Sequence, residues 1–452
     1  MDTIVALGTP AGRSAIGVIR LSGPDSLSIL RSIVGDNHFR PRPSQSVLRS
    51  LRSNGSSSIL DRALLTYFPA PNSYTGEDVV EISCHGSPVI LRQVVDLSLA
   101  LGARLSGPGE FTLRALGNGK LDLNQAEAIR DLINAQTEAA AQQALRQLMG
   151  ELSSRLQGSQ EKLIQTIVQL ESALEFVEDD LPQLRKHQIA EELTNVATDL
   201  NRLASTFERG HLLRDGVRVT LAGRPNVGKS SLFNMLLASE RAIVTEVPGT
   251  TRDTISERIS LDGVPVVLTD TAGLRVSTDR IESMGVERTH QAMADADLVV
   301  VVLDGSEDLL AEDFTVLSQA RTRRHIVTLN KSDMPSFYTL EKSRSSFEGK
   351  TINVSAITGD GLETLRAAIM EPFRLVDLSN AGFLITDARH YDLMLRACAE
   401  VESSVDLLKD GASEELVLVG LHNGLRFLGQ ITGETTTDEI LTEIFATFCI
   451  GK

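Results

Sequence analysis

The segment that most constrains the fold is residues 223–230, which read Gly-Arg-Pro-Asn-Val-Gly-Lys-Ser. It follows the alternating apolar residues of 217–221, a strand pattern, and precedes a helix start at Ser231. A glycine-rich loop at this junction directs backbone N–H groups toward a phosphate, and the helix dipole adds roughly half a positive charge there. A glycine-rich structural turn is the alternative, and the motifs downstream argue against it. The sequence therefore predicts a Ras-like P-loop domain of the α/β class.

Residues in and after this loop are expected to bind the phosphates of a nucleotide. In such loops the lysine, here Lys229, reaches the β and γ phosphates, and the Ser230 hydroxyl binds magnesium. A second strand pattern, 264–269, leads into Asp270-Thr-Ala-Gly273, which places a carboxylate on the magnesium side and a glycine near the γ-phosphate. The predicted phosphate-side residues are Asn226, Val227, Gly228, Lys229, Ser230, Ser231, Asp270, Thr271, Ala272 and Gly273.

A third motif predicts which base is bound. The strand pattern 326–329 ends in Asn330-Lys331-Ser-Asp333, and Asp333 offers two acceptors to the N1 and N2 donors that guanine has and adenine lacks. Ser355 and Ala356 would complete the base pocket from a neighbouring loop, although Ser-Ala alone is a weak signal. These motifs indicate GTP rather than ATP, and they predict a GTPase domain at residues 214–376.

One departure from Ras-like enzymes bears on catalysis. Leu274 follows Asp-Thr-Ala-Gly, where Ras-like enzymes place a glutamine that orients the attacking water. The chain therefore needs another water-positioning group and another positive charge for the transition state. Where an arginine finger supplies that charge, it raises the rate of hydrolysis by a factor of about 10³ to 10⁵. Asn226 offers a carbonyl oxygen to a monovalent cation, and Glu282 is a candidate for the water, although its residue type by itself favours a solvated surface carboxylate.

A candidate switch lies between the first two motifs. Gly249-Thr-Thr-Arg-Asp253 supplies Thr250 and Thr251, whose hydroxyls suit a mobile segment that closes on magnesium and the γ-phosphate.

Across essentially its whole length the chain resembles one family, the tRNA-modification GTPases known as MnmE or TrmE. The segments that carry this resemblance are 223–230, 249–253, 270–275, Gly17-Val-Ile-Arg-Leu-Ser-Gly23, Tyr74-Thr-Gly-Glu-Asp78, Pro108-Gly-Glu-Phe111, Lys120-Leu-Asp-Leu-Asn-Gln-Ala-Glu-Ala128 and the terminal Phe448-Cys-Ile-Gly-Lys452.

The resemblance implies which groups replace the missing glutamine and the missing positive charge. Glu282 would position the water, and potassium would replace the arginine finger when two GTPase domains meet across a homodimer. The implied magnesium ligands are Ser230 and Thr251, and the implied potassium ligands are Asn226, Thr245, Val247 and Thr250. Glu246, Pro248 and Gly249 would complete the GTP-binding segment.

The chain is expected to have three domains, because 452 residues are too many for one core. Short strand patterns, including 46–51 and 59–68, predict an α+β domain at 1–118. Apolar residues at steps of three and four then predict a helical domain, made of 119–213 and 377–452, into which the GTPase domain is inserted. The three stripes are Leu163, Ile167, Leu170, Leu174 and Val177, then Leu193, Val196, Leu200, Leu203 and Phe207, then Tyr391, Met394, Cys398, Val401, Val405 and Leu408.

The N-terminal domain resembles the tetrahydrofolate-binding fold of aminomethyltransferases. The resemblance implies a one-carbon folate site at Arg20, Glu77, Lys120 and Lys452. A carboxylate can read a pterin ring, and Arg or Lys can pair with the glutamate tail. By residue type alone each of the four is an ordinary charged residue. His85 has no metal spacing or nucleophile partner and is interpreted as structural.

Net charge and cysteines limit the partners. A charge of −16 argues against an autonomous nucleic-acid binder. The family resemblance implies that an FAD-dependent partner, MnmG or GidA, provides much of the tRNA-binding surface. No apolar run is long enough for a membrane span, and the N-terminus has no signal-peptide pattern, so a cytoplasmic protein is expected. Cys84 and Cys398 are interpreted as packing residues, and Cys449 is either a functional thiol or structural.

The resemblance implies a potassium-activated GTP hydrolase which, with its FAD-dependent partner, installs an aminomethyl or carboxymethylaminomethyl group at carbon 5 of the wobble uridine (position 34) of certain tRNAs. The alternatives are a ribosome-assembly GTPase, which would normally carry a basic RNA-binding domain, and a signalling GTPase with slow turnover.

Overall fold

The computed structural model describes residues 2–53, 58–175, 183–240, 255–270, 291–337, 350–373 and 382–451. The chain divides into two compact units, between which it passes several times. The first unit contains Met1–Asn134, Ala144–Asn201 and Asp392–Lys452, and the second contains Ala135–Gln143 and Arg202–Tyr391. The predicted multidomain α/β fold class is confirmed, with an α+β N-terminal part, a helical part and a P-loop sheet. The predicted domain limits stay predictions.

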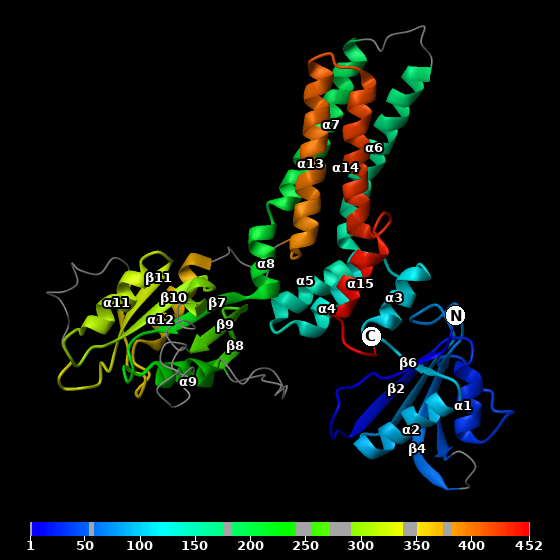
Figure 1. Ribbon diagram of the computed structural model, residues 1–452, viewed down its shortest axis with the longest axis horizontal. Helices are drawn as coiled ribbons and strands as arrows, with labels where there is room; N and C mark the ends of the chain where they lie inside the picture. Colours follow the sequence, from blue (N-terminus) through cyan, green and yellow to red (C-terminus); the bar gives the residue numbers. More distant parts are fainter. Residues whose placement is uncertain are drawn as a thin grey trace. The chain divides into compact units, whose positions relative to one another are not determined.

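The first unit begins with a six-stranded sheet of order β3-β4-β5-β2-β1-β6, antiparallel except where β1 pairs with β6. Helices α1 and α2 cover one face of it (Figure 1). On β2, Ile19 and Leu21 are buried against these helices, and because side chains alternate along a strand, Arg20 and Ser22 lie on the opposite face. The elements are β1 (Ile4–Leu7), β2 (Ile16–Ser22), α1 (Ser26–Val34), β3 (Val47–Arg52), β4 (Ile59–Phe68), β5 (Val79–His85), α2 (Pro88–Ala100) and β6 (Arg104–Leu105).

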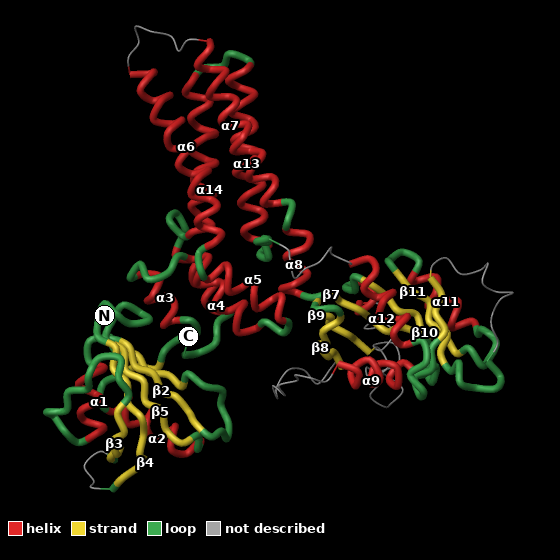
Figure 2. Tube along the Cα trace, turned by 180° about the vertical axis from the view of Figure 1, so that it is seen from behind, coloured by secondary structure: helices red, strands yellow, loops and turns green. Residues whose placement is uncertain are grey.

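The helical part contains four long helices, α6, α7, α13 and α14, which lie side by side (Figures 1 and 2). The described residues of each predicted apolar stripe lie on one of these helices, except Phe207. Helix α7 ends at Ala204, so Phe207 begins the separate helix α8; Val177 lies outside the described residues. The helices are α3 (Glu110–Gly117), α4 (Leu123–Asn134), α5 (Glu138–Leu148), α6 (Glu151–Glu175), α7 (Gln183–Ala204), α13 (Ala388–Lys409), α14 (Glu414–Thr432) and α15 (Asp438–Ala446).

The second unit is built on a six-stranded sheet of order β12-β11-β10-β7-β9-β8, in which only β8 runs antiparallel to its neighbour. Strand β10 is buried along its whole length, as expected for a strand covered on both faces. The elements are α8 (Phe207–Asp215), β7 (Val217–Ala222), α9 (Lys229–Glu240), β8 (Ile255–Leu261), β9 (Val264–Asp270), β10 (Leu298–Asp304), α11 (Ala311–Ala320), β11 (His325–Asn330), β12 (Lys350–Asn353), α12 (Leu362–Met370) and the 3₁₀ helix Glu371–Phe373.

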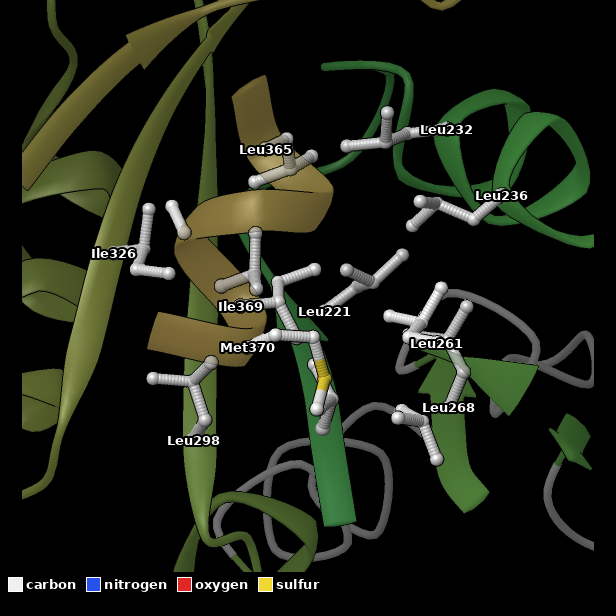
Figure 3. Close-up of a cluster of buried hydrophobic side chains, with 14 of the residues drawn as sticks. Leu221, Leu232, Leu236, Leu261, Leu268, Leu298, Ile326, Leu365, Ile369 and Met370 are labelled. Carbon is white, nitrogen blue, oxygen red and sulfur yellow. The ribbon is translucent and has the colours of Figure 1, made fainter. Parts of the chain in front are cut away.

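Alternate residues of β10 contribute to two cores. Val300 and Val302 belong to the core that α9 and α12 cover, where Leu232 and Leu236 meet Leu365 and Ile369 across Leu221 (Figure 3). Val299 and Val301 belong to the opposite core, which α11 covers. Because the strand order reverses at β7, with β10 on one side and β9 on the other, the carboxyl ends of these strands border the crevice in which such sheets bind ligands. Among the described helices, none has the length and apolar character needed to span a membrane.

The packing of α14 can be tested with two leucines on the same helix. Leu421 is fully buried, whereas Leu416 is 56% exposed. Leu421→Ala should lower the free energy of unfolding by about 2 to 5 kcal/mol, because it leaves a cavity, and Leu416→Ala should change it by about 0.5 kcal/mol or less. Urea unfolding followed by helical circular dichroism measures both, and equal losses would contradict this packing.

Candidate functional site

The sequence motifs of the second unit meet at one edge of its sheet. Residues 223–228 follow β7, and Asp270, Asp304 and Asn330 are the last residues of β9, β10 and β11. These strands are parallel, so their carboxyl ends lie at the same edge. Ser355 and Ala356 follow shortly after β12, the next strand in the sheet. The structure thus brings together all the predicted nucleotide-binding motifs that it describes.

The P-loop backbone has the conformation that an anion-binding loop requires. Asn226 and Gly228 have left-handed backbones, with φ of 64° and 95°. Residues of this kind let successive N–H groups face one concavity. Lys229 is the first residue of α9, two residues before the predicted helix start, and its buried ammonium donates to the carbonyl oxygens of Gly223 at 2.9 Å and Arg224 at 2.8 Å. The lysine is therefore fixed at the mouth of the loop.

The buried side chain of Asn330 joins the P-loop to the predicted base loop. Its Nδ2 donates to the carbonyl oxygen of Val227 at 2.8 Å, and its Oδ1 accepts from the N–H of Ala356 at 3.0 Å. A Cβ on Gly228 would stand 2.2 Å from the same Nδ2, so only glycine allows this approach. The first residue of the predicted base motif thus also has a structural task that its motif did not reveal.

Ser230 and Asp270 form the oxygen pair expected of a magnesium site. The Ser230 hydroxyl donates to Oδ2 of Asp270 at 2.7 Å, and Asp270 is only 2% exposed. Hydroxyl and carboxylate oxygens are the hard donors that magnesium prefers. The residues present therefore fit this ion.

The base-side residues are also held in place. Ser355 donates its hydroxyl to Oδ1 of Asp333 at 2.6 Å and accepts the N–H of Thr358 at 3.1 Å. Lys331 forms an ion pair with the buried Asp304. Burial alone would raise the pKa of Asp304, but its hydrogen bonds with Lys331 and Ser306 outweigh burial, so the pKa lies below its usual value. Asp304 is therefore ionised at neutral pH.

No sequence motif assigns a role to Arg224, which lies inside the P-loop. Its guanidinium donates to Glu307 at 2.8 Å and to the buried carboxylate of Asp313 at 3.2 Å. Asp313 also accepts the N–H of Leu310 at the start of α11. Arg224 thus fastens the P-loop to the segment that follows β10. No motif predicts this pairing, because the partners are more than eighty residues away in the sequence.

Several predicted residues lie outside the described part of the chain. They include the proposed catalytic residue and most of the proposed potassium ligands, and their roles stay predictions: Thr245, Glu246, Val247, Pro248, Gly249, Thr250, Thr251, Thr271, Ala272, Gly273, Glu282 and Lys452.

In the first unit, Arg20 occupies the face of the sheet opposite α1 and α2. Its guanidinium donates to Oε1 of Glu81 at 2.6 Å and to the carbonyl oxygen of Gly451 at 3.4 Å. It also lies 5.5 Å from the ring centre of Tyr74 and 5.9 Å from that of Phe111. A predicted folate residue thus meets the C-terminal motif and two aromatic rings, which the spacing of the sequence could not show.

Glu77 and Lys120 lie near one another. Glu77 accepts from the Ser22 hydroxyl at 2.7 Å and from Arg114 at 3.0 Å. Lys120 is exposed, and its Cε stands 3.2 Å from the position that a Cβ on Gly76 would take, beside Glu77 in the chain. Since Ser22 is two residues from Arg20 on β2, Glu77 reaches the face that carries Arg20. This side of the sheet therefore carries the Arg20–Glu81 and Arg114–Glu77 ion pairs, whose carboxylates and guanidiniums can pair with the polar ring edge and the anionic tail of a ligand.

The remaining candidates separate by burial. Cys84 and Cys398 are buried, and burial raises the pKa of each thiol to about 12. Cys449 is exposed. The His85 ring lies 2.7 Å from the Asp61 carboxylate, which also accepts the backbone N–H of His85. This pairing agrees with the structural interpretation of His85.

Two family models match the chain. Residues 3–120 match the one described as "GTP-binding protein TrmE N-terminus", and residues 123–449 match the "MnmE helical domain". Similar curated proteins include two called "tRNA modification GTPase MnmE". The protein from Koribacter versatilis is 43% identical and that from Aquifex aeolicus is 41% identical, in each case over 100% of this chain and at least 99% of the relative.

Two similar solved structures each cover part of the chain. The G domain of the FeoB iron transporter of T. maritima is 27% identical over 35% of this chain and 99% of that chain, with a TM-score of 0.28. Aquifex aeolicus Era bound to GDP and AlF4⁻ is 22% identical over 40% of this chain and 66% of that chain, with a TM-score of 0.29. At these TM-scores the likeness carries no conclusion about this chain.

If Asn330 joins the P-loop to the base loop, breaking one of its two hydrogen bonds should weaken nucleotide binding. Asn330→Asp keeps the acceptor for Ala356 but replaces the donor to Val227 with an oxygen, which leaves a buried acceptor unpaired. We expect GDP to bind about ten- to a hundredfold more weakly, in line with about 1 to 3 kcal/mol for such a defect. Titration with a fluorescent GDP analogue measures this loss. Asn423→Asp on α14 is the control, and an unchanged affinity in Asn330→Asp would contradict the assigned role.

Proposed function

Because the chain belongs to the tRNA modification GTPase MnmE family, we propose that it is a potassium-activated GTPase that modifies the wobble uridine of certain tRNAs together with an FAD-dependent partner. Family membership rests on the match of residues 123–449 and on relatives of 43% and 41% identity over the whole chain. The predicted family and the predicted class of enzyme, a GTP hydrolase, are thereby confirmed.

The observation that carries the GTPase part of the proposal is the hydrogen-bonded frame at the carboxyl edge of the second sheet. Ser230 and Asp270 supply a magnesium-type oxygen pair, and Asp333 is held by Ser355 where its carboxylate can accept the two guanine donors. Asn330 joins the two ends of this frame. Bound magnesium would neutralise charge on the β and γ phosphates, and we propose Ser230 and Thr251 as its protein ligands.

The contacts of Arg224 favour a mechanism in which a bound cation, and not a P-loop arginine, stabilises the transition state. An arginine in this loop could in principle supply the positive charge that the transition state needs. Here its guanidinium is paired with Glu307 and Asp313, on the side of the α11 segment. We therefore propose that potassium supplies this charge, held by Asn226, Thr245, Val247 and Thr250, and that two GTPase domains of a homodimer enclose it. Glu282 would position the attacking water.

The first unit would hold the one-carbon donor. We propose that a tetrahydrofolate binds on the face that carries Arg20 and Glu77, with Lys120 and Lys452 as further cations. In this proposal the folate supplies the carbon of the aminomethyl-type group at carbon 5 of the wobble uridine, and the FAD-dependent MnmG or GidA partner provides much of the tRNA-binding surface. The net charge of −16 supports such a division of labour, since tRNA phosphates repel an acidic chain.

The proposal is tested in a strain that lacks the gene for this chain. Mass spectrometry of its tRNAs should show wobble uridine without the group at carbon 5, and the wild-type gene should restore it. Glu282→Ala should not restore it, because GTP turnover would be lost while nucleotide affinity stays nearly unchanged. Glu363→Ala, at an 83% exposed side chain on α12, should restore it fully. Unaltered tRNA in the deletion strain would overturn the proposal.

A further inference from the structure

The last described residues of the chain, Phe445–Gly451, form a segment that lies between α4 and the N-terminal sheet; we call it the C-terminal segment. Phe445 and Phe448 are buried in one cluster with Leu123 and Ala126 of α4, and the two phenyl rings are 4.9 Å apart. The cluster holds the segment against α4, which begins at Leu123 within the Lys120–Ala128 motif, so this motif has a packing role in addition to the proposed folate contact of Lys120. The α4 part of this motif therefore provides the apolar contacts that hold the C-terminal segment.

Two glycines fit this segment closely. Gly109 has a left-handed backbone, with φ of 64°, and a Cβ there would stand 2.8 Å from a ring carbon of Phe445. Gly451, with φ of 92°, would place a Cβ 2.7 Å from the carbonyl oxygen of Leu7 at the end of β1. Each position has a left-handed backbone and leaves no space for a Cβ, so both Gly109 and Gly451 must be glycine.

Polar contacts fix the segment between these glycines. The N–H of Gly109 donates to the carbonyl oxygen of Cys449 at 3.3 Å, beside an antiparallel bridge between Pro108 and Ile450. From the sheet side, Arg20 donates to the carbonyl oxygen of Gly451. The backbone that carries Cys449 is thus held by the same face of the sheet that holds the folate candidates.

Arg130 reaches the segment from α4. Its Nη1 donates to the Thr447 hydroxyl at 3.0 Å, and its guanidinium lies 5.8 Å from the ring centre of Phe448, within the range of a cation–π contact. Its Nε donates to Asp131 at 3.2 Å, which orients the guanidinium. The arginine side chain is 17% exposed, whereas Thr447 is exposed, so the hydrogen bond between them lies at the surface.

We propose that Arg130 is a positioning residue: through Thr447 and Phe448 it fixes the C-terminal segment beside Arg20 and Glu77, and so sets one wall of the folate site. The identity of the ligand rests on the proposed function, whereas the position of the segment does not. Without Arg130, the apolar contacts of Phe445 and Phe448 would still hold the chain to α4, but Thr447 would lose a charged hydrogen bond that, together with the contacts of Cys449–Gly451, fixes the direction of the segment.

The cysteines provide a probe of this position in the full chain. Of the three, Cys84 and Cys398 are buried and Cys449 is exposed, so a nitroxide reagent should label Cys449 selectively under native conditions. In Arg130→Met, the spin-label spectrum should change from immobilised to mobile. Thr447→Val should do the same, since it removes the acceptor without altering α4. Arg155→Met, which removes an exposed ion pair on α6, is the matched control and should leave the spectrum unchanged.

Ligand binding is then measured on unlabelled protein with 5-formyltetrahydrofolate, a stable one-carbon folate. Arg130→Met should weaken binding by about tenfold or more, from the loss of a charged hydrogen bond, and Arg130→Lys should recover part of it. GTP hydrolysis should stay within about twofold, because the nucleotide motifs lie in the other unit.

The outcomes separate the positioning role from the proposed function. An immobilised label in both Arg130→Met and Thr447→Val overturns the positioning role. A mobile label with unchanged folate affinity overturns the claim that the segment forms a wall of the site. A mobile label in a protein whose wild type binds no folate supports the positioning role and overturns the folate part of the proposed function.

Discussion

The nucleotide site depends on one buried amide. The Asn330 side chain bonds to a carbonyl oxygen of the P-loop and to an N–H of the Ser355–Ala356 loop, and so connects the phosphate end of the site to the base end. A buried polar group with both bonding atoms paired stabilises and specifies its surroundings, whereas one left unpaired is costly. Gly228 allows the approach by having no side chain. The loops at the carboxyl edge of the sheet therefore form one frame.

The hydrogen-bonded loops do not themselves supply all the positive charge that stabilises the transition state of GTP hydrolysis. Lys229 is bound to loop carbonyls, where it can still face the phosphates, but Arg224 and Lys331 are each paired with carboxylates. Leu274 replaces the glutamine of Ras-like enzymes. An arrangement of this kind suits an external cation, which the proposed mechanism supplies as potassium.

The sequence predicted the parts of the structure that depend on local pattern. The strand before residue 223, the loop and the following helix come from a contiguous motif, and the stripes of α6, α7 and α13 come from helical periodicity. Contacts between distant segments could not be predicted in this way. Arg224 meets Asp313, and Arg130 meets Thr447, because the fold brings remote residues together, and no spacing rule in one sequence encodes such pairs. Break points such as the end of α7 at Ala204 depend similarly on tertiary packing.

The most direct test of the account is steady-state GTP hydrolysis by the purified chain in potassium chloride and in sodium chloride at equal ionic strength. The proposed mechanism should give a large stimulation that is specific to potassium and that grows with protein concentration, because the cation would act between two GTPase domains. Equal, slow rates in both salts at all protein concentrations would contradict it, and would indicate a GTPase that awaits an external activator.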